Sequence, residues 1–243
     1  MLFNWTEEKL EWYVRGSLYA GFHRTLAEKI RPALEKTDAL VDLGCGPGLI
    51  DLELAQDVKS ITAIDINQIV LQHLEEDIAD RKNTNIRTVC GDVKESPDDL
   101  LPSSFDVALF SFFGGPGEVF EVAYQKASRL VIIITHGSDT AKKPSKIGGE
   151  FHRAFAGDVS AWLDENKLKY TTTYDSYDFG QPFVSLEEAE RFFEVYAKEG
   201  EVGSEERLAQ IDKQLSLVKK TDDPKYPYYF PNMKDTAIFL VEK

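Results

Sequence analysis

Apolar positions along the chain follow two different spacings. Residues 5 to 36 carry large apolar side chains about every 3.6 positions, which predicts a helical N-terminal extension over 1–36 that Gly16 and Gly21 loosen or divide. Short apolar runs then alternate with helical stretches. We expect strands at 39–43, 60–64, 85–89, 104–110, 129–135, 168–174 and 236–241. Strands that alternate with helices predict an α/β protein with a mostly parallel sheet.

A long segment separates the last two predicted strands. Residues 185–198 and 204–219 both have an amphipathic helical pattern, and Ser185 followed by Glu188 is typical of a helix start. The ends of the insertion are anchored near the rim of the sheet. We therefore expect residues 180–234 to form a helical lid whose apolar faces pack on the pocket mouth. A fixed subdomain or a dimer contact would use the same pattern.

The first predicted strand ends in a glycine-rich turn. Residues 39–48 read Ala-Leu-Val-Asp-Leu-Gly-Cys-Gly-Pro-Gly, and a helical pattern begins at Leu49. Glycines are needed where the backbone takes a positive φ or where a ligand approaches the chain closely. A dinucleotide fingerprint, G-x-G-x-x-G, would need a third glycine at position 49. The spacing is G-x-G-x-G instead, preceded by the acid Asp42.

This string resembles motif I of the class I S-adenosylmethionine-dependent methyltransferases. The resemblance covers residues 39–135 well and 160–241 loosely. It implies a single domain over 1–243 with a Rossmann-like three-layer sandwich, in which a seven-stranded sheet has its last strand antiparallel between strands five and six. It also implies that S-adenosyl-L-methionine is the cofactor and S-adenosyl-L-homocysteine the product. The motif residues expected to bind the cofactor are Asp42, Gly44, Cys45, Gly46 and Gly48.

Further cofactor-binding residues are implied at the ends of later strands. Asp65 ends the second strand, where an acid can accept hydrogen bonds from ribose hydroxyls, although it could also cap the next helix. The resemblance places Ile66 against the adenine face and Asp92 with Val93 at the adenine edge. Other candidates are Ser111 after the fourth strand, and Tyr13 and Tyr19 in the N-terminal extension.

The residues that would bind the methyl acceptor have a weaker signal in the sequence than those that would bind the cofactor. Aromatic residues follow the fourth strand and precede the last one, and the candidates to bind a substrate are Phe112, Phe113, Tyr228 and Tyr229. If the acceptor must lose a proton, His136 at the end of the fifth strand is the first candidate base and His23 the second. A hydrogen-bonded structural histidine is the alternative for both. No group of residues has metal-ligand spacing.

The amino-acid composition limits the classes of partner that the protein is expected to bind. The chain has 243 residues, 42% of them hydrophobic, and a net charge of −14, which argues against a nucleic-acid backbone as partner. It shows no long apolar run and no secretory signal, and its two cysteines are typical of reduced residues, so we expect a cytoplasmic monomer or homodimer without membrane contact. The favoured function is methyl transfer to a small molecule. A catalytically silent cofactor-binding partner and a nicotinamide oxidoreductase are the alternatives.

Overall fold

Seven strands form the central sheet of the computed structural model, which describes residues 4–115, 117–137, 155–197 and 204–243. Their order is β3-β2-β1-β4-β5-β10-β6, and β10 runs antiparallel to both of its neighbours. This confirms the predicted mostly parallel sheet with an antiparallel last strand. The strands are β1 (Ala39–Leu43), β2 (Ser60–Asp65), β3 (Ile86–Cys90), β4 (Phe105–Ser111), β5 (Ala127–His136), β6 (Tyr170–Asp178) and β10 (Met233–Glu242).

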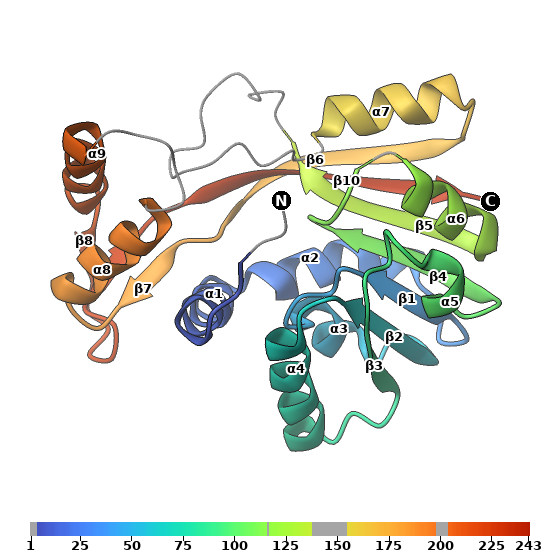
Figure 1. Cartoon of the computed structure of the whole chain (residues 1–243), viewed down its shortest axis with the longest axis horizontal. Coiled ribbons are helices and arrows are strands. Elements are labelled where there is room, and N and C mark those ends of the chain that lie inside the picture. Colours follow the sequence, from blue (N-terminus) through green and yellow to red (C-terminus); the bar gives the residue numbers. More distant parts are fainter. Residues whose placement is uncertain (1–3, 116, 138–154, 198–203) are drawn as a thin grey trace.

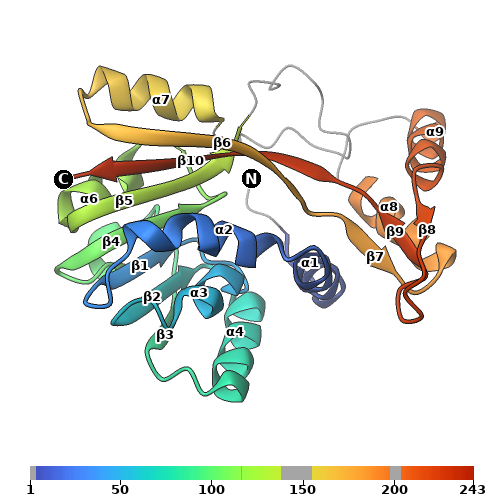
Figure 2. The ribbon, with the colours of Figure 1, turned by 180° about the vertical axis from the view of Figure 1, so that it is seen from behind.

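Helices cover both faces of this sheet, which confirms the three-layer sandwich (Figures 1 and 2). Buried or partly buried apolar side chains from three helices pack on one face of the sheet, and those from three others pack on the opposite face. The first group is α2 (Phe22–Ile30), α3 (Leu49–Leu54) and α4 (Gln68–Arg81). The second group is α5 (Pro97–Leu100), α6 (Glu118–Lys126) and α7 (Ala156–Glu165). Because β1 lies between β2 and β4, the chain reverses its direction of winding there, which is where open α/β sheets place their ligands.

The N-terminal extension is two helices rather than one. Helix α1 (Glu7–Ala20) begins after Thr6, whose side chain accepts a hydrogen bond from the Lys9 N–H, and ends at Gly21 with φ 68°. Gly16 does not divide the segment, since it lies inside α1. A Cβ there would come within 3.0 Å of the Gly180 carbonyl, so this glycine allows close packing. Helix α2 is followed by a short 3₁₀ turn, η1 (Arg31–Ala33), so the helix is shorter than predicted.

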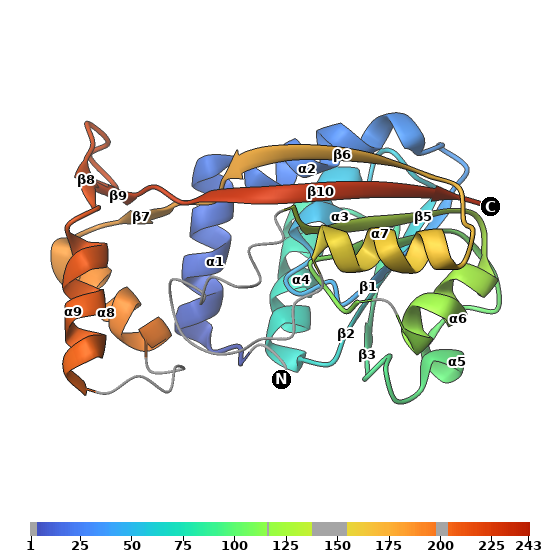
Figure 3. The same cartoon turned by 90° about the horizontal axis from the view of Figure 1, so that it is seen from above.

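The insertion contains a small sheet that the sequence pattern did not predict. Its strands are β7 (Gln181–Phe183), β8 (Lys219–Lys220) and β9 (Tyr228–Phe230), and its helices are α8 (Leu186–Ala197) and α9 (Ser204–Leu215). The long strands β6 and β10 continue past the main sheet and lead into it (Figure 3). Strand β6 therefore ends four residues later than expected, and β10 begins three residues earlier.

The apolar faces of the insertion pack mainly on one another. Phe193, Ile211 and Phe230 belong to one buried cluster, and Trp12 of α1 contacts α8 with its ring 5.2 Å from that of Phe192. Phe192 and Tyr196 of α8 also line the large cavity at the carboxyl ends of the parallel strands, so the expected packing on the pocket mouth holds for part of one helix and not for the whole insertion. A lid role for residues 180–234 stays a prediction. Within the described ranges, no helix has the length and apolar character needed to cross a membrane.

Candidate active site

A cavity of about 1370 Å³ lies above the carboxyl ends of the parallel strands. Its two halves differ in chemistry. The glycine-loop half, over β1, β2 and β3, contains Gly44, Cys45, Gly46, Pro47, Asp65, Ile66, Asn67, Gly91, Asp92, Val93 and Lys94. The aromatic half, over β4, β5 and β10, contains Phe112, His136, Phe179, Gln181, Phe192, Tyr196, Phe230, Asn232 and Lys234. A drug-sized ligand needs a pocket of roughly 300–1,000 Å³, so this volume accommodates two small molecules together.

The glycines of the turn serve different purposes. All three have positive φ, and a Cβ on Gly44 would lie 2.2 Å from the Phe113 ring while one on Gly48 would lie 2.4 Å from Leu74. These two glycines therefore allow packing within the protein. A Cβ on Gly46 would point into the cavity, where its nearest neighbour is Trp5 Cζ2 at 3.7 Å. Gly46 is thus the position at which a bound molecule can approach the backbone.

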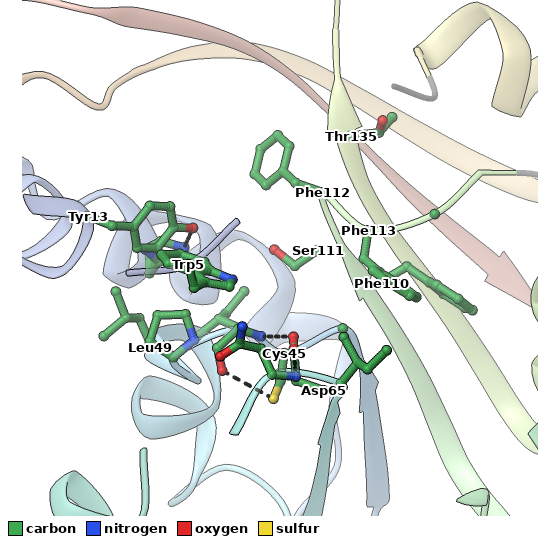
Figure 4. A pocket seen from close by; sticks show the side chains of 18 of the residues that line it. Trp5, Tyr13, Cys45, Leu49, Asp65, Phe110, Ser111, Phe112, Phe113 and Thr135 are labelled. Carbon is green, nitrogen blue, oxygen red and sulfur yellow. Dashed lines mark hydrogen bonds between the residues drawn. The ribbon is translucent and has the colours of Figure 1, made fainter. Parts of the chain in front are cut away.

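Asp65 is held rigidly beside that position (Figure 4). Its Oδ2 accepts the Gly46 N–H at 2.9 Å, and its Oδ1 accepts the Asn67 N–H at 2.8 Å. Burial raises the pKa of Asp65, and the backbone hydrogen bonds oppose that rise. A carboxylate offers about four acceptor positions, so both oxygens can still accept hydrogen bonds from a ligand in the cavity. The role as an acceptor and the role as a loop support are therefore compatible.

An apolar slot adjoins Asp65. Ile66 is 41% exposed, and it lines the cavity together with the buried Val93. Asp92 lines the same half, and its Oδ1 accepts the Lys94 N–H at 2.9 Å in a tight turn. The structure thus brings together four of the predicted cofactor residues, Asp65, Ile66, Asp92 and Val93, and places Ser111 at the boundary between the halves.

Asp42 does not reach the cavity. It is fully buried in β1, as is Asp51 in α3, and the two carboxyl groups interact with each other, while neither has a hydrogen bond to a third group among the described residues. Burial and the neighbouring Asp51 raise the pKa of Asp42. The assignment of Asp42 to direct cofactor contact is therefore wrong. Cys45 does line the cavity, but burial raises the pKa of its thiol, so it stays protonated.

Two residues of the N-terminal extension close the glycine-loop half. The Trp5 ring lies edge-on to Tyr13 at 5.2 Å and stands over Gly46 (Figure 4). Tyr13 was expected in this place, whereas Trp5 was not. Tyr19 was expected too, but it lines a separate surface pocket and packs on Tyr229 instead. The structure therefore contradicts its assignment to the cofactor.

His23 is a poor candidate for a base. Its Nδ1 lies 2.6 Å from Ser17 Oγ and its Nε2 lies 3.1 Å from Tyr13 Oη, so both ring nitrogens have partners. Burial, with a smaller effect from Lys234, lowers the pKa of His23 to about 3. The imidazole is thus a neutral, structural group. His136 is less buried and lines the aromatic half, 5.2 Å from the Phe112 ring, so it stays the candidate.

The Phe112–Phe113 pair is split between the two halves. Phe112 has φ 54°, a left-handed conformation that is uncommon for a residue with a large side chain, and the two rings point apart (Figure 4). Phe112 enters the aromatic half. Phe113 packs on Gly44 and lies 5.2 Å from Lys94 Nζ, in the glycine-loop half. Of the two expected substrate contacts, Phe112 alone is placed where that role requires.

The tyrosines of β9 do not line the cavity. Tyr228 packs against the buried cluster of the insertion, and the Tyr229 hydroxyl donates a hydrogen bond to Asp178 Oδ2. Phe230, the next residue, is the one that lines the cavity. The sequence analysis also missed Phe179 and Lys234. Their only signal in the sequence is their position, since Phe179 follows the end of β6 and Lys234 lies at the start of β10. The sequence also carries four basic residues between β5 and α7, Lys142, Lys143, Lys146 and Arg153, and these lie outside the described residues.

The fold is that of a Rossmann-like α/β protein, and its cavity lies at the switch point of the sheet. Residues 40–131 match the family model described as a methyltransferase domain. This match covers less than half of the chain, and it agrees with the resemblance of the same segment to the class I S-adenosylmethionine-dependent methyltransferases.

Solved structures agree on the fold. The YcgJ protein from Bacillus subtilis is 13% identical with a TM-score of 0.60, over 91% of this chain and 98% of that one. A proposed methyltransferase from Bacillus halodurans C-125 is 15% identical with a TM-score of 0.59, over 90% and 98%. Precorrin-6y C5,15-methyltransferase from Geobacter metallireducens is 13% identical with a TM-score of 0.53, over 90% and 88%. At such identities the likeness concerns the fold.

Proposed function

We propose that the protein is an enzyme that transfers a methyl group from S-adenosyl-L-methionine to a small molecule. The observation that carries this proposal is the pairing of Asp65 with the Gly46 N–H at the cavity wall, inside the segment that matches a methyltransferase domain. Gly46 leaves room for close approach, and Asp65 leaves acceptor positions for two neighbouring hydroxyls. The residues present therefore fit an adenosine-containing cofactor.

Each part of that cofactor has suitable neighbours in the glycine-loop half. Asp65 would hold the ribose hydroxyls, while Ile66 and Val93 would flank the adenine and Asp92 would meet its edge. Bound S-adenosylmethionine supplies a methyl group already activated by the positive sulfur, so positioning and exclusion of water can provide much of the rate. Trp5 covers the loop and restricts the entry of water from that side.

The aromatic half is the place for the acceptor. It adjoins the glycine-loop half through Ser111, and both belong to one continuous cavity. His136 lines this half and can take a proton from the acceptor if the reaction needs it. The small-molecule assignment is supported by the net charge of −14, which disfavours binding to a nucleic-acid backbone. Both cysteines are free thiols, in keeping with a cytoplasmic location.

A labelled-methyl assay tests this proposal. The full chain would be incubated with S-adenosylmethionine carrying a labelled methyl group and a pool of cellular metabolites, and the products would be separated by mass. We expect labelled small molecules that are absent when the Asp65→Ala variant replaces the wild type. Cofactor binding without any labelled product would favour the catalytically silent partner, and binding of a nicotinamide nucleotide instead would favour the oxidoreductase.

A further inference from the structure

A lysine side chain stands among aromatic rings in the aromatic half of the cavity. Lys234 belongs to β10 and pairs with Tyr177 of β6, at the place where both strands leave the main sheet for the small one (Figure 3). Two hydrogen bonds hold the backbone in place there. The Phe179 backbone N–H donates to the Asn232 carbonyl at 2.8 Å, and the side-chain amide of Asn232 donates to the Phe179 carbonyl at 3.2 Å. Lys234 is therefore presented from a rigid junction.

The ammonium group is surrounded by three rings from three separate segments. Lys234 Nζ lies 4.1 Å from the centroid of Phe112, 4.8 Å from that of Phe179 and 5.2 Å from that of Phe22. Phe22 and Phe179 also pack on each other at 4.6 Å. Ring faces attract a cation, and the contact is stronger where water is excluded. The rings thus hold a positive charge inside a largely apolar cavity.

This charge acts on its surroundings. It is one of the two causes that lower the pKa of the buried His23, the other being burial itself. A charge that influences a neighbour across the cavity wall would also act on a molecule inside the cavity.

We infer that the methyl acceptor is an organic anion with an aromatic or apolar body, and that Lys234 binds its carboxylate, phosphate or similar group. This inference rests on the proposed function, because it assigns the aromatic half to the acceptor. Phe112 and Phe179, which line the same half, would contact the apolar body. The glycine-loop half would keep the cofactor, so Lys234 sets acceptor choice without contributing to cofactor affinity.

A matched pair of probes tests the inference directly. The two probes are 2-naphthoate and 2-naphthamide, which share a ring system and differ in charge. Their affinities would be measured by calorimetry on the full chain, alone and saturated with S-adenosylhomocysteine. We expect the wild type to bind the anion about tenfold or more tightly than the amide, as a charge-assisted contact requires. Equal affinities, or binding of neither probe at millimolar concentration, would overturn the inference.

Variants of the lysine assign the preference to one side chain. Lys234→Gln should remove the preference for the anion, whereas Lys234→Arg should retain most of it. Lys220→Gln is the matched control, since Lys220 is exposed on β8 and does not line the cavity. A Lys234→Gln protein that is folded by circular dichroism and still prefers naphthoate would refute the role of this residue. Because the probes are also tested without cofactor, failure to bind S-adenosylhomocysteine would count against the proposed function alone.

Discussion

The buried pair beneath the glycine turn makes stability depend on pH in a specific way. Asp42 and Asp51 are both fully buried, and burial is the main reason why the pKa of Asp51 rises from 3.8 to about 7. A folded pKa above the unfolded one means that the native state binds more protons than the unfolded state in this window. Stability contributed by protonated Asp51 is therefore complete below about pH 4 and is lost as the pH rises towards 7.

The size of this effect follows from the two pKa values. The difference between 3.8 and about 7 corresponds to about 4 kcal/mol of unfolding free energy, since one pKa unit is worth about 1.4 kcal/mol. Asn cannot ionise, so Asp51→Asn removes the contribution of Asp51, whereas Asp42, whose pKa is raised by burial and by Asp51, still titrates in the variant. The unfolding free energy of the variant, relative to the wild type, should therefore increase between about pH 4 and about pH 8, by up to about 4 kcal/mol.

Urea unfolding at several pH values measures this difference, with the slope against urea checked for constancy. Asp80→Asn is the control, because Asp80 is exposed on α4 and does not line the cavity. Its difference from the wild type should stay constant to within about half a kcal/mol, as is usual for surface changes. If the Asp51→Asn difference is equally constant with pH, the reasoning from burial is refuted.

Two further predictions concern the cavity wall. Gly46→Ala should weaken S-adenosylhomocysteine binding in calorimetry, because the new methyl group faces the cavity, while the left-handed backbone should cost only about 1–2 kcal/mol of stability; unchanged affinity would mean that no ligand approaches there. The His23 ring signals should stay fixed in an NMR titration from about pH 5 to about pH 8, because its pKa is lowered to about 3. That low pKa also means that stability from neutral His23 is complete above about pH 6.5 and falls at lower pH, and a ring midpoint near 6.5 would show that the imidazole is accessible.

The parts of the site that the sequence predicted are local in the chain. The glycine turn and Asp65 each lie at the end of a strand whose apolar run is visible in the sequence, and parallel strands bring such ends to one edge. Asp42 shows the limit of that reasoning. Side chains alternate along β1, so Asp42 shares the face of Leu40 and points beneath α3, where Asp51 also lies. The alternation of side chains along the strand, considered without the resemblance to motif I, predicts a core position for Asp42.

The aromatic half could not be predicted because its residues come from distant segments. Phe112, Phe179 and Lys234 converge because β6 and β10 pair along their length, which brings Phe179 and Lys234 together beside Phe112, the residue after β4. Nothing in the local pattern around Lys234 distinguishes it from a solvated lysine at a strand end. Tyr228 and Tyr229 were chosen for their chemistry, but Tyr229 lies on the opposite face of β9 from Phe230, and Tyr228, on the same face as Phe230, packs on the buried cluster of the insertion.

Binding of the cofactor product is the most direct test of the central claim. Calorimetry would compare S-adenosylhomocysteine binding to the wild type, to Asp65→Ala and to Asp80→Ala as the exposed control, with a nicotinamide nucleotide titrated in parallel. The account predicts binding to the wild type and the control, no binding of the nicotinamide nucleotide, and a loss of about 1–3 kcal/mol in Asp65→Ala, the cost of unpaired buried hydroxyls. Equal affinity in wild type and Asp65→Ala, or no binding to either, would contradict it.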